Sequence, residues 1–430
     1  MSLSNGLFAA VSGLDTTSTA ISVIGDNIAN VNTPGFKQRR AEFADVLGQT
    51  LNTAGGFSQT GAGSKLARVG QIFSQGTFES SARTTDMAIE GRGFFVLNGP
   101  QGRFYTRAGL FNFDNQGALV DKEGLRVQGF GIDPVTRLPV GQIGDIQLTQ
   151  GVSPPNPSSL VDISVNLDSG ATPPPTPFDP SKPSATSNFQ TAVTLFDSLG
   201  NGVSSNLYFT NTGPGSWTWT ATLAPGDTTT APATPGDPVV VQGGGTLTFD
   251  SQGNLTGATG TNVTYQFAGG AAPGQTVAFN FGPIAGVGTG TPTTQFADSS
   301  AVNSTFTDGF APGTLQAISV DKDGIITGSF SNGESLPLAQ IALATFPNVN
   351  GLNSVGNSNF LESRQSGQSL IGAPRSGQFG SIRASSIEQS NVDMAEQFVK
   401  LIISQRAFQA NTRTVSVTNE LLANVVQLGQ

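Results

Sequence analysis

Residues 3–37 read LSNGLFAAVSGLDTTSTAISVIGDNIANVNTPGFK, and the spacing of the apolar residues in this stretch decides the fold. Side chains that can pack recur at alternating steps of four and three residues, the pattern of a long helix with a heptad seam. The seam consists of Leu3, Leu7, Ala10, Leu14, Thr17, Ile21, Ile24, Ile28 and Val31. The charged residues between Leu3 and Val31 are Asp15 and Asp26. A solvated helix normally carries more charge, so we expect contact on most sides.

The predicted helix ends within Asn30-Val31-Asn32-Thr33-Pro34-Gly35-Phe36-Lys37. Asparagine tolerates the left-handed backbone conformation, and Pro34 cannot continue a helix. Pro-Gly also favours a type II turn. The sequence therefore predicts a sharp turn directly after the first helix.

A second long helix is predicted near the other end of the chain. It begins at Ser390-Asn391-Val392-Asp393, where a capping residue is followed three positions later by an acid. Its first seam consists of Met394, Phe398, Leu401, Gln405, Phe408, Thr412, Val415, Asn419, Leu422 and Val426. Polar seam residues such as Gln405, Thr412 and Asn419 can fix the register of a helix pair. A second seam consists of Ile403, Ala407, Ala410, Val417, Leu421 and Leu428.

Two seams on one helix need two kinds of neighbour. One neighbour can be the N-terminal helix of the same chain, and the other is most simply a second copy of the chain. An ordinary hairpin of two helices within one chain explains the seams equally well. The seams alone leave both explanations open.

Between the helices the sequence indicates β-structure. Asp-x-x-Gly turns flanked by alternating apolar residues, as in hairpins, recur at 114–117, 121–124, 197–200, 250–253 and 321–324. Proline-rich stretches at 154–157 and 173–183 cannot be central strands and indicate loops or linkers. The predicted fold class is mainly β with long terminal α-helices and nested, discontinuous domains.

Three domains are predicted, each outer one built from an early and a late segment. Residues 1–70 and 365–430 form a terminal helical domain with its connecting segment. Residues 71–147 and 296–364 form a middle β domain. Residues 148–295 form an inserted outer β domain.

Composition excludes several kinds of chemistry. The chain has no Cys and no His, which removes disulfides, thiolate or imidazole metal sites, and Cys-His or Ser-His catalysis. We predict no catalytic residues, no metal and no cofactor, and we expect that the protein is not an enzyme. The stretch 151–310 has nine Asp, no Glu, one Lys and no Arg, so its charge is −9 + 1 = −8. An acidic middle without arginine argues against nucleic-acid binding.

No targeting or membrane segment is evident. The N-terminal stretch has no basic residue before Lys37, and its apolar residues are spaced rather than massed, unlike a secretory signal. No run approaches the ~18 consecutive apolar residues of a membrane span. We expect no membrane insertion, and if the protein is exported, a route without a cleaved signal peptide.

Three local motifs have a simple structural explanation. Asp321-Lys322-Asp323-Gly324 lacks the later ligands of a calcium loop, so a hairpin turn is the better interpretation. Residues 61–65, GAGSK, lack the spacing of a phosphate-binding loop and are interpreted as a flexible loop. Scattered acids could form a glycosidase pair, but a sequence cannot place two carboxylates in space.

Four ordered blocks carry a family resemblance. The stretch 28–37, IANVNTPGFK, resembles the N-terminal signature of flagellar rod and hook proteins. The stretches 86–96, DMAIEGRGFFV, and 105–109, YTRAG, with Phe111, resemble the family's next conserved blocks. Ser390-Asn391-Val392-Asp393 and the helix that follows are similar to its C-terminal signature. The resemblance covers roughly 1–147 and 296–430.

The resemblance implies a subunit of a tubular polymer on the outside of the bacterium. The terminal helices would pair as an inner layer around a channel, and the β domains would form outer layers. The residues expected in this inner-tube assembly are Leu3, Leu7, Leu14, Ile21, Ile24, Ile28, Met394, Phe398, Leu401, Phe408, Val415, Leu422 and Val426. The family signature turn comprises Asn30, Asn32, Thr33, Pro34, Gly35 and Phe36.

The resemblance also implies partners and a location. These are further copies in a helical homopolymer, the distal rod protein, the hook cap protein, the hook–filament junction protein and the flagellar type III export apparatus. Phe43 and Leu47 fit the family's short export-gate motif. The inserted stretch 148–295 favours a structural subunit of the curved hook, a flexible joint that transmits motor torque. A distal rod or other axial protein is the alternative.

Overall fold

A computed structural model describes the whole chain except residues 1, 54–55, 134–135, 137, 149–150, 233, 288–289 and 429–430. The chain divides into two compact units. Unit 1 comprises Met1–Gln150, Ala317–Ser329 and Ser335–Gln430, and unit 2 comprises Gly151–Gln316 and Phe330–Glu334. The predicted fold class, mainly β with long terminal helices, is confirmed. The division into three domains stays a prediction.

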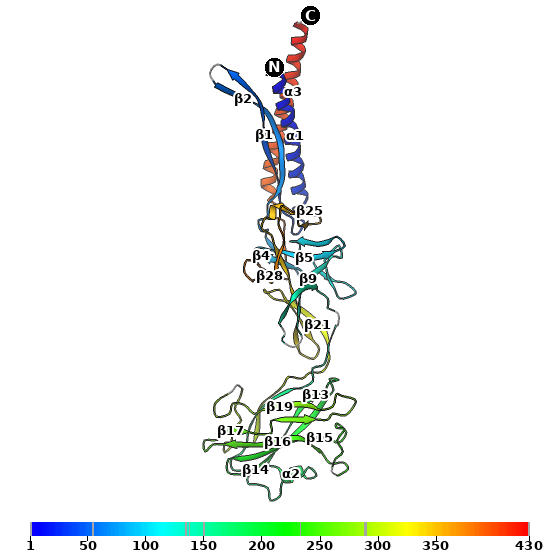
Figure 1. The fold of residues 1–430 in the computed structure, drawn as a ribbon, viewed down its shortest axis with the longest axis vertical. Coiled ribbons are helices and arrows are strands. Elements are labelled where there is room, and N and C mark those ends of the chain that lie inside the picture. The colour runs from blue at the N-terminus through cyan, green and yellow to red at the C-terminus, as the bar shows by residue number, and fades with distance from the viewer. Residues whose placement is uncertain are drawn as a thin grey trace. The chain divides into compact units, whose positions relative to one another are not determined.

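The two long helices of unit 1 lie side by side and run antiparallel, with both chain ends at the same end of the pair (Figure 1). They are α1, Ser2–Ala29, and α3, Met394–Leu428. A long hairpin of β1, Arg39–Thr53, and β2, Gly56–Gln71, lies along α1. Thr16 Oγ1 and Ser64 Oγ are 3.2 Å apart, and the Ser64 amide donates to Ser12 Oγ at 3.2 Å.

The expectation of a flexible loop at 61–65 was wrong, because this stretch lies within β2. Gly63 has a φ of +96°, and a Cβ there would collide with the Ser12 side chain. Small residues on both elements therefore let the strand approach the helix closely. The contact with α1 therefore leaves no room for a larger residue at position 63.

The start of the second helix also differs from the expectation. Asp393, and not Ser390, is the capping residue, since its Oδ1 accepts from the amides of Ala395 at 2.8 Å and Glu396 at 3.2 Å. The Asn391 side chain bonds instead to the backbone of Gln38 and Ile72. Residues 390–392 therefore attach the helix to the rest of unit 1 before the helix begins.

The β part of unit 1 surrounds two adjoining apolar cores. Phe95, Leu97 and Ile341 are fully buried in one, and Phe94 and Tyr105 are buried in the other. The main sheet follows the path β22-β23-β9-β5-β6-β26-β25, and short pairs β28-β4 and β29-β3 lie beside it. The bounds are β3 Phe78–Ser80, β4 Met87–Glu90, β5 Phe94–Gly99, β6 Gly102–Thr106, β7 Asn112–Phe113, β8 Leu119–Val120, β9 Arg126–Ile132, β10 Pro139–Asp145, β21 Gly313–Val320, β22 Ile325–Phe330, β23 Ser335–Ile341, β24 Leu343–Thr345, η1 Val349–Gly351, β25 Asn353–Gly356, β26 Asn359–Leu361, β27 Leu370–Gly372, β28 Ser381–Ala384 and β29 Ser386–Glu388. β21 runs across the boundary between the units.

Unit 2 is a separate β structure around the two tryptophans of the chain. Its sheet follows the path β13-β14-β15-β16-β18-β19-β12-β20, with β17 beside β16. Trp217 and Trp219 on β15 are buried in one large apolar core with Phe209 and Leu247. The bounds are β11 Val152–Ser153, β12 Leu160–Asn166, α2 Pro183–Thr186, β13 Phe189–Phe196, β14 Gly202–Gly213, β15 Ser216–Leu223, β16 Val239–Phe249, β17 Leu255–Ala258, β18 Asn262–Tyr265, β19 Gln275–Asn280 and β20 Ala301–Thr307.

The predicted Asp-x-x-Gly turns are confirmed, and all five have the same construction. In each, the aspartate Oδ1 accepts from the amides two and four residues later, at 2.8 or 2.9 Å. The glycines have a φ between +72° and +85°, where a side chain would be strained. Asp321 is thus occupied by backbone amides, which supports the interpretation as a turn.

The stability of unit 2 can be measured separately by fluorescence, because both tryptophans of the chain lie in it. Truncation of Leu247, which is paired with Trp217 across the sheet and has no exposed surface, should leave a cavity. We expect Leu247→Ala to lower the free energy of unfolding by ~2–5 kcal/mol. Tryptophan fluorescence during urea unfolding measures the change. Val240→Ala, in the same strand but 44% exposed, is the control and should have little effect, and equal effects would contradict the assigned core.

Candidate functional site

The signature turn lies at the junction between the helices and the β part of unit 1. Gly35 has a φ of +69°, and its amide donates to the backbone oxygen of Glu388 at 2.8 Å. A Cβ at Gly35 would lie 2.5 Å from the amide nitrogen of Ala108. Gly35 and Phe36 are buried, whereas Asn32 is exposed and Asn30, Thr33 and Pro34 are half-buried. The turn is therefore held between two distant segments of the chain.

A buried cluster of three charges lies directly behind this turn. Lys37 Nζ is 2.6 Å from Glu388 Oε1, and Arg107 Nη1 is 3.4 Å from Glu388 Oε2. The exposed fractions of these side chains are 1% for Lys37, 8% for Arg107 and 0% for Glu388. The guanidinium of Arg107 also lies over the ring of Phe94. We call Lys37, Arg107 and Glu388 the charge cluster.

Burial makes the charge cluster costly unless each member has its partners. Desolvation lowers the pKa of Lys37, and the Glu388 carboxylate opposes this shift. Burial likewise lowers the pKa of Arg107 against the same carboxylate. Backbone groups supply further bonds: Lys37 Nζ donates to Ser74 O at 2.8 Å, and Arg107 Nη2 donates to Gly91 O at 2.8 Å.

Two asparagines connect this junction to the helices. Asn391 Oδ1 accepts from the Gln38 amide at 2.7 Å, just before α3. Asn27, near the end of α1, accepts from the Arg39 amide and donates to the Arg39 oxygen, both at 2.8 Å. Its Nδ2 also lies 3.1 Å from Gln397 Oε1 on α3. The junction thereby fixes the C-terminal end of α1 and the N-terminal end of α3.

All four sequence blocks meet at this junction. Lys37 belongs to the first, Gly91 to the second, Arg107 to the third, and Glu388 lies just before the fourth. The amide of Met87 donates to Gly109 O at 2.8 Å, and a Cβ at Gly109 would collide with Met87 O. Sequence reasoning did not identify the charge cluster. The available signal was that charged residues are rare in this chain, so Lys37 and Arg107 within the blocks and Glu388 just before the last one suggest a structural pairing.

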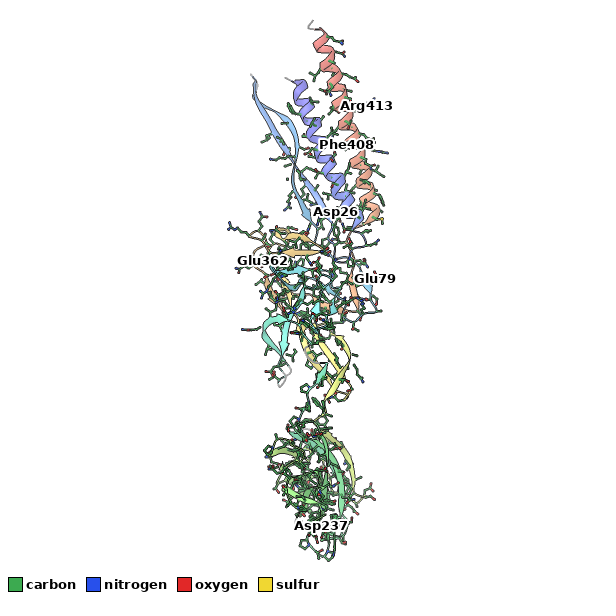
Figure 2. All side chains as sticks on the ribbon, turned by 90° about the vertical axis from the view of Figure 1, so that its right-hand side faces the viewer. Asp26, Glu79, Asp237, Glu362, Phe408 and Arg413 are labelled. Carbon is green, nitrogen blue, oxygen red and sulfur yellow. The ribbon has the colours of Figure 1, made fainter. Side chains whose placement is uncertain are left out.

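The predicted inner-tube residues occupy different positions on the helix pair. On α1, Ile24 is buried, and Leu7, Leu14, Ile21 and Ile28 are half-buried. On α3, Leu401 and Val415 are half-buried, and Met394, Phe398, Phe408 and Leu422 are exposed. The side chains of Leu3 and Val426 lie outside the described part of the structure. Figure 2 shows Phe408 and Arg413 along α3 and Asp26 at the lower end of α1.

The polar residues that face α1 are not those expected. Gln405, Thr412 and Asn419 are exposed. Gln397, Ser404, Asn411 and Thr418 are buried or half-buried instead. Because these positions are also seven residues apart, the sequence pattern could not distinguish the two sets. Ile403, Val417 and Leu421 of the predicted second seam are also exposed. Further exposed apolar residues, which neither seam of α3 nor the seam of α1 contains, are Phe8, Val11, Val399 and Ile402.

We call the exposed apolar residues of α1 and α3 the apolar flanks. They comprise Phe8, Val11, Met394, Phe398, Val399, Ile402, Ile403, Phe408, Val417, Leu421 and Leu422. Among described residues, Gly6–Ala29 is long and apolar enough to cross a membrane, with a mean hydropathy of 1.4 and 17% of the window buried. The expectation of no such stretch considered only unbroken apolar runs. An exposed apolar surface of this kind is typical of an interaction site.

The two residues of the export-gate motif lie in β1. Phe43 pairs with Leu66 across the hairpin, and Leu47 pairs with Gly61. Phe43 is 42% exposed and Leu47 is 73% exposed. Both side chains are therefore accessible in the folded chain.

Family profiles match most of the chain. They are a flagella basal body rod protein profile over 7–37, a flagellar hook protein FlgE/F/G D1 domain over 88–169, a flagellar basal body protein FlaE D2 domain over 166–310, and a flagellar basal body rod FlgEFG protein C-terminal profile over 383–428.

Individual relatives are similar over nearly their whole length. The flagellar hook protein FlgE of Borreliella burgdorferi is 33% identical over 458 residues, covering 98% of this chain and 99% of the relative. That of Escherichia coli is 33% identical over 434 residues, covering 97% and 98%. The crystal structure of Helicobacter pylori flagellar hook protein FlgE2 aligns with a TM-score of 0.49 and 16% identity, covering 72% of this chain and all of that one.

Removing the carboxylate of the charge cluster should destabilise unit 1. Glu388→Gln leaves Lys37 and Arg107 buried without an opposite charge, so we expect a loss of ~3–5 kcal/mol. Scanning calorimetry of the soluble chain measures the shift of the unit 1 transition. Asp323→Asn is the matched control, because its ion pair with Arg375 is exposed and worth at most ~1 kcal/mol. A charge cluster without structural importance would give similar, small shifts in both variants.

Proposed function

The chain belongs to the flagellar hook protein family and is a structural subunit of the flagellar hook, and we propose that its polymer acts as a universal joint. A universal joint must transmit torque from the motor while it bends. The observation that supports this role is the contrast between the two units. Unit 1 carries the apolar flanks, and unit 2 carries surfaces of uncharged polar residues. The first suits permanent contacts between copies, and the second suits contacts that can slide.

The apolar flanks are the proposed inner-tube contact. Val399 and Ile403 are 57% and 60% exposed on α3, and Phe8 is 67% exposed on α1. Burying each such side chain between copies would contribute ~1.5–3 kcal/mol. Burying several of them would therefore stabilise an inner layer formed by neighbouring copies. A lipid bilayer would also cover an apolar helix. Membership of a family whose members form an extracellular polymer favours other copies over a membrane.

Unit 2 is the proposed sliding layer. Its aspartates at 197 and 250 are engaged by backbone amides in turns. The strands between the turns expose threonines whose hydroxyls are bonded to one another, such as Thr246 to Thr259 at 2.8 Å and Thr256 to Thr248 at 3.2 Å. Contacts between such surfaces contribute at most ~1 kcal/mol each and can be exchanged as the tube bends.

The remaining assignments follow from the family. The proposed partners are the distal rod protein, the hook cap protein, the hook–filament junction protein and the type III export apparatus, which would read Phe43 and Leu47. Export would proceed without a cleaved signal peptide. We assign no enzymatic activity, because the proposed role is mechanical and the charged residues of the junction are used for structure.

A charge placed on an apolar flank should block assembly without unfolding the chain. In Ile403→Asp the carboxylate would be buried between copies without a partner, at a cost of several kcal/mol. We expect no tubes by electron microscopy and an unchanged calorimetric profile of the soluble chain. Val140→Asp, at an apolar residue 47% exposed on β10, is the control and should still form tubes. Normal tubes from Ile403→Asp would exclude the apolar flanks as the inner contact.

Removing most of unit 2 tests whether unit 1 is sufficient for polymerisation and unit 2 controls bending. Asn156 and Phe310 exchange two backbone hydrogen bonds at 3.1 and 3.0 Å, so the chain can be rejoined there by a short glycine linker. Deletion of 157–309 should leave polymerisation intact and change the curvature or bending stiffness of the tube. Electron microscopy of purified polymers measures both properties. Complete loss of polymer from a chain whose unit 1 remains folded would refute the sliding-layer role.

A further inference from the structure

We propose that a lane of small residues on α1 and polar residues on α3 sets the register of the helix pair, and so the alignment of the apolar flanks. The proposal rests on the function proposed above, because alignment matters only if neighbouring copies bind the flanks. The lane comprises Gly13, Ala20 and Asn27 on α1, facing Asn411, Ser404 and Gln397 on α3. We call it the register lane.

The lower contact of the register lane is a buried amide pair. Asn27 Nδ2 donates to Gln397 Oε1 at 3.1 Å, and the two side chains are each 1% exposed. Asn27 Nδ2 also donates to Arg39 O, and Asn27 Oδ1 accepts from the Arg39 amide, so this side chain is held in place. Gln397 Nε2 has no acceptor within the described part of the chain. An incompletely satisfied buried amide costs stability, and its main effect is to specify one alignment.

The upper contact is a close approach of the Asn411 side chain to the backbone of Gly13. A Cβ on Gly13 would lie 2.7 Å from Asn411 Nδ2 and 3.0 Å from Asn411 Cγ. Gly13 lies 27 − 13 = 14 residues before Asn27, and Asn411 lies 411 − 397 = 14 residues after Gln397. In an antiparallel pair the two contacts are thus separated by two heptads on both helices. Equal spacing on both helices is what a single register requires.

The middle position of the register lane fits the same spacing. Ala20 lies seven residues from each α1 contact, and Ser404 lies seven residues from each α3 contact. Both line one groove of about 210 Å³ together with Ile24 and Ile403. A small residue and a small polar residue therefore line the same groove at this level of the helix pair.

A slip of one heptad disrupts the register lane in either direction. If α3 moved so that Asn411 faced Ala20, the Ala20 Cβ would occupy the space that Gly13 leaves open. In the opposite direction Gln397 would face Ala20 and lose its bond to Asn27. Either slip displaces the apolar flanks of α3 by ~10 Å relative to α1, at 1.5 Å per residue. A neighbouring copy would then meet a mismatched surface.

The first experiment introduces a steric clash between residues 13 and 411 and then removes it. In the full chain, Gly13→Ala should raise the critical concentration for tube formation about tenfold, equivalent to ~1.4 kcal/mol. Adding Asn411→Ala removes the colliding amide and should restore the critical concentration to within about twofold of the parent. Sedimentation of polymer measures all three chains. Gly6→Ala and Gly25→Ala are matched controls, because a Cβ at either position meets nothing within 4 Å.

Cross-linking reports the register itself. The chain has no Cys, so Ala20→Cys with Ser404→Cys creates one reactive pair. A bismaleimide should join the two cysteines within one subunit of the otherwise unchanged polymer. The yield of this cross-link should fall when Gly13→Ala is added and recover when Asn411→Ala is added as well. An unchanged Gly13→Ala chain, or a defect that Asn411→Ala does not relieve, would overturn the register lane. If the parent chain itself formed no tubes, the proposed function would fail instead, and the two failures are distinguishable.

Discussion

A single carboxylate holds the junction on which the rest of unit 1 depends. Glu388 is fully buried between Lys37 and Arg107, and its backbone oxygen accepts from Gly35. A buried carboxylate is tolerated only when its surroundings supply opposite charge and hydrogen bonds. The signature turn, the β part of unit 1 and the segment before α3 must therefore come together at one place. The positions of both helices follow from that meeting point through Asn27 and Asn391.

The junction and the helix pair are held together by different kinds of interaction. The junction has charges whose partners are all within the chain. The helix pair has a polar interior contact between Asn27 and Gln397, and it leaves large apolar residues such as Phe398 exposed. An ordinary two-helix hairpin would place the large apolar residues between its helices. The exposure of so many large apolar residues suits the proposed role of the apolar flanks as contacts between copies.

Features that depend on neighbouring residues could be predicted from the sequence. Each Asp-x-x-Gly turn is closed by its own carboxylate, and the low charge of residues 3–31 indicated a helix with many contacts. The charge cluster could not be predicted, because Lys37 and Glu388 are 351 positions apart. The hairpin of β1 and β2 was missed because GAGSK has little strand propensity and is held by its fit to α1. Which residues of α3 face α1 could not be predicted, because the exposed set with Gln405 and the less exposed set with Gln397 share the same seven-residue spacing.

The separation of Lys37 from Glu388 has a consequence for how the chain matures. A protein is synthesised from its N-terminus, and the Asp-x-x-Gly hairpins can close as soon as they emerge. The signature turn cannot, since its carboxylate comes 351 positions later, shortly before the last helix. A chain that stops early keeps an unneutralised lysine and arginine where the junction should form. The junction can therefore form only once residue 388 has been made, so the two terminal helices are brought together late in synthesis.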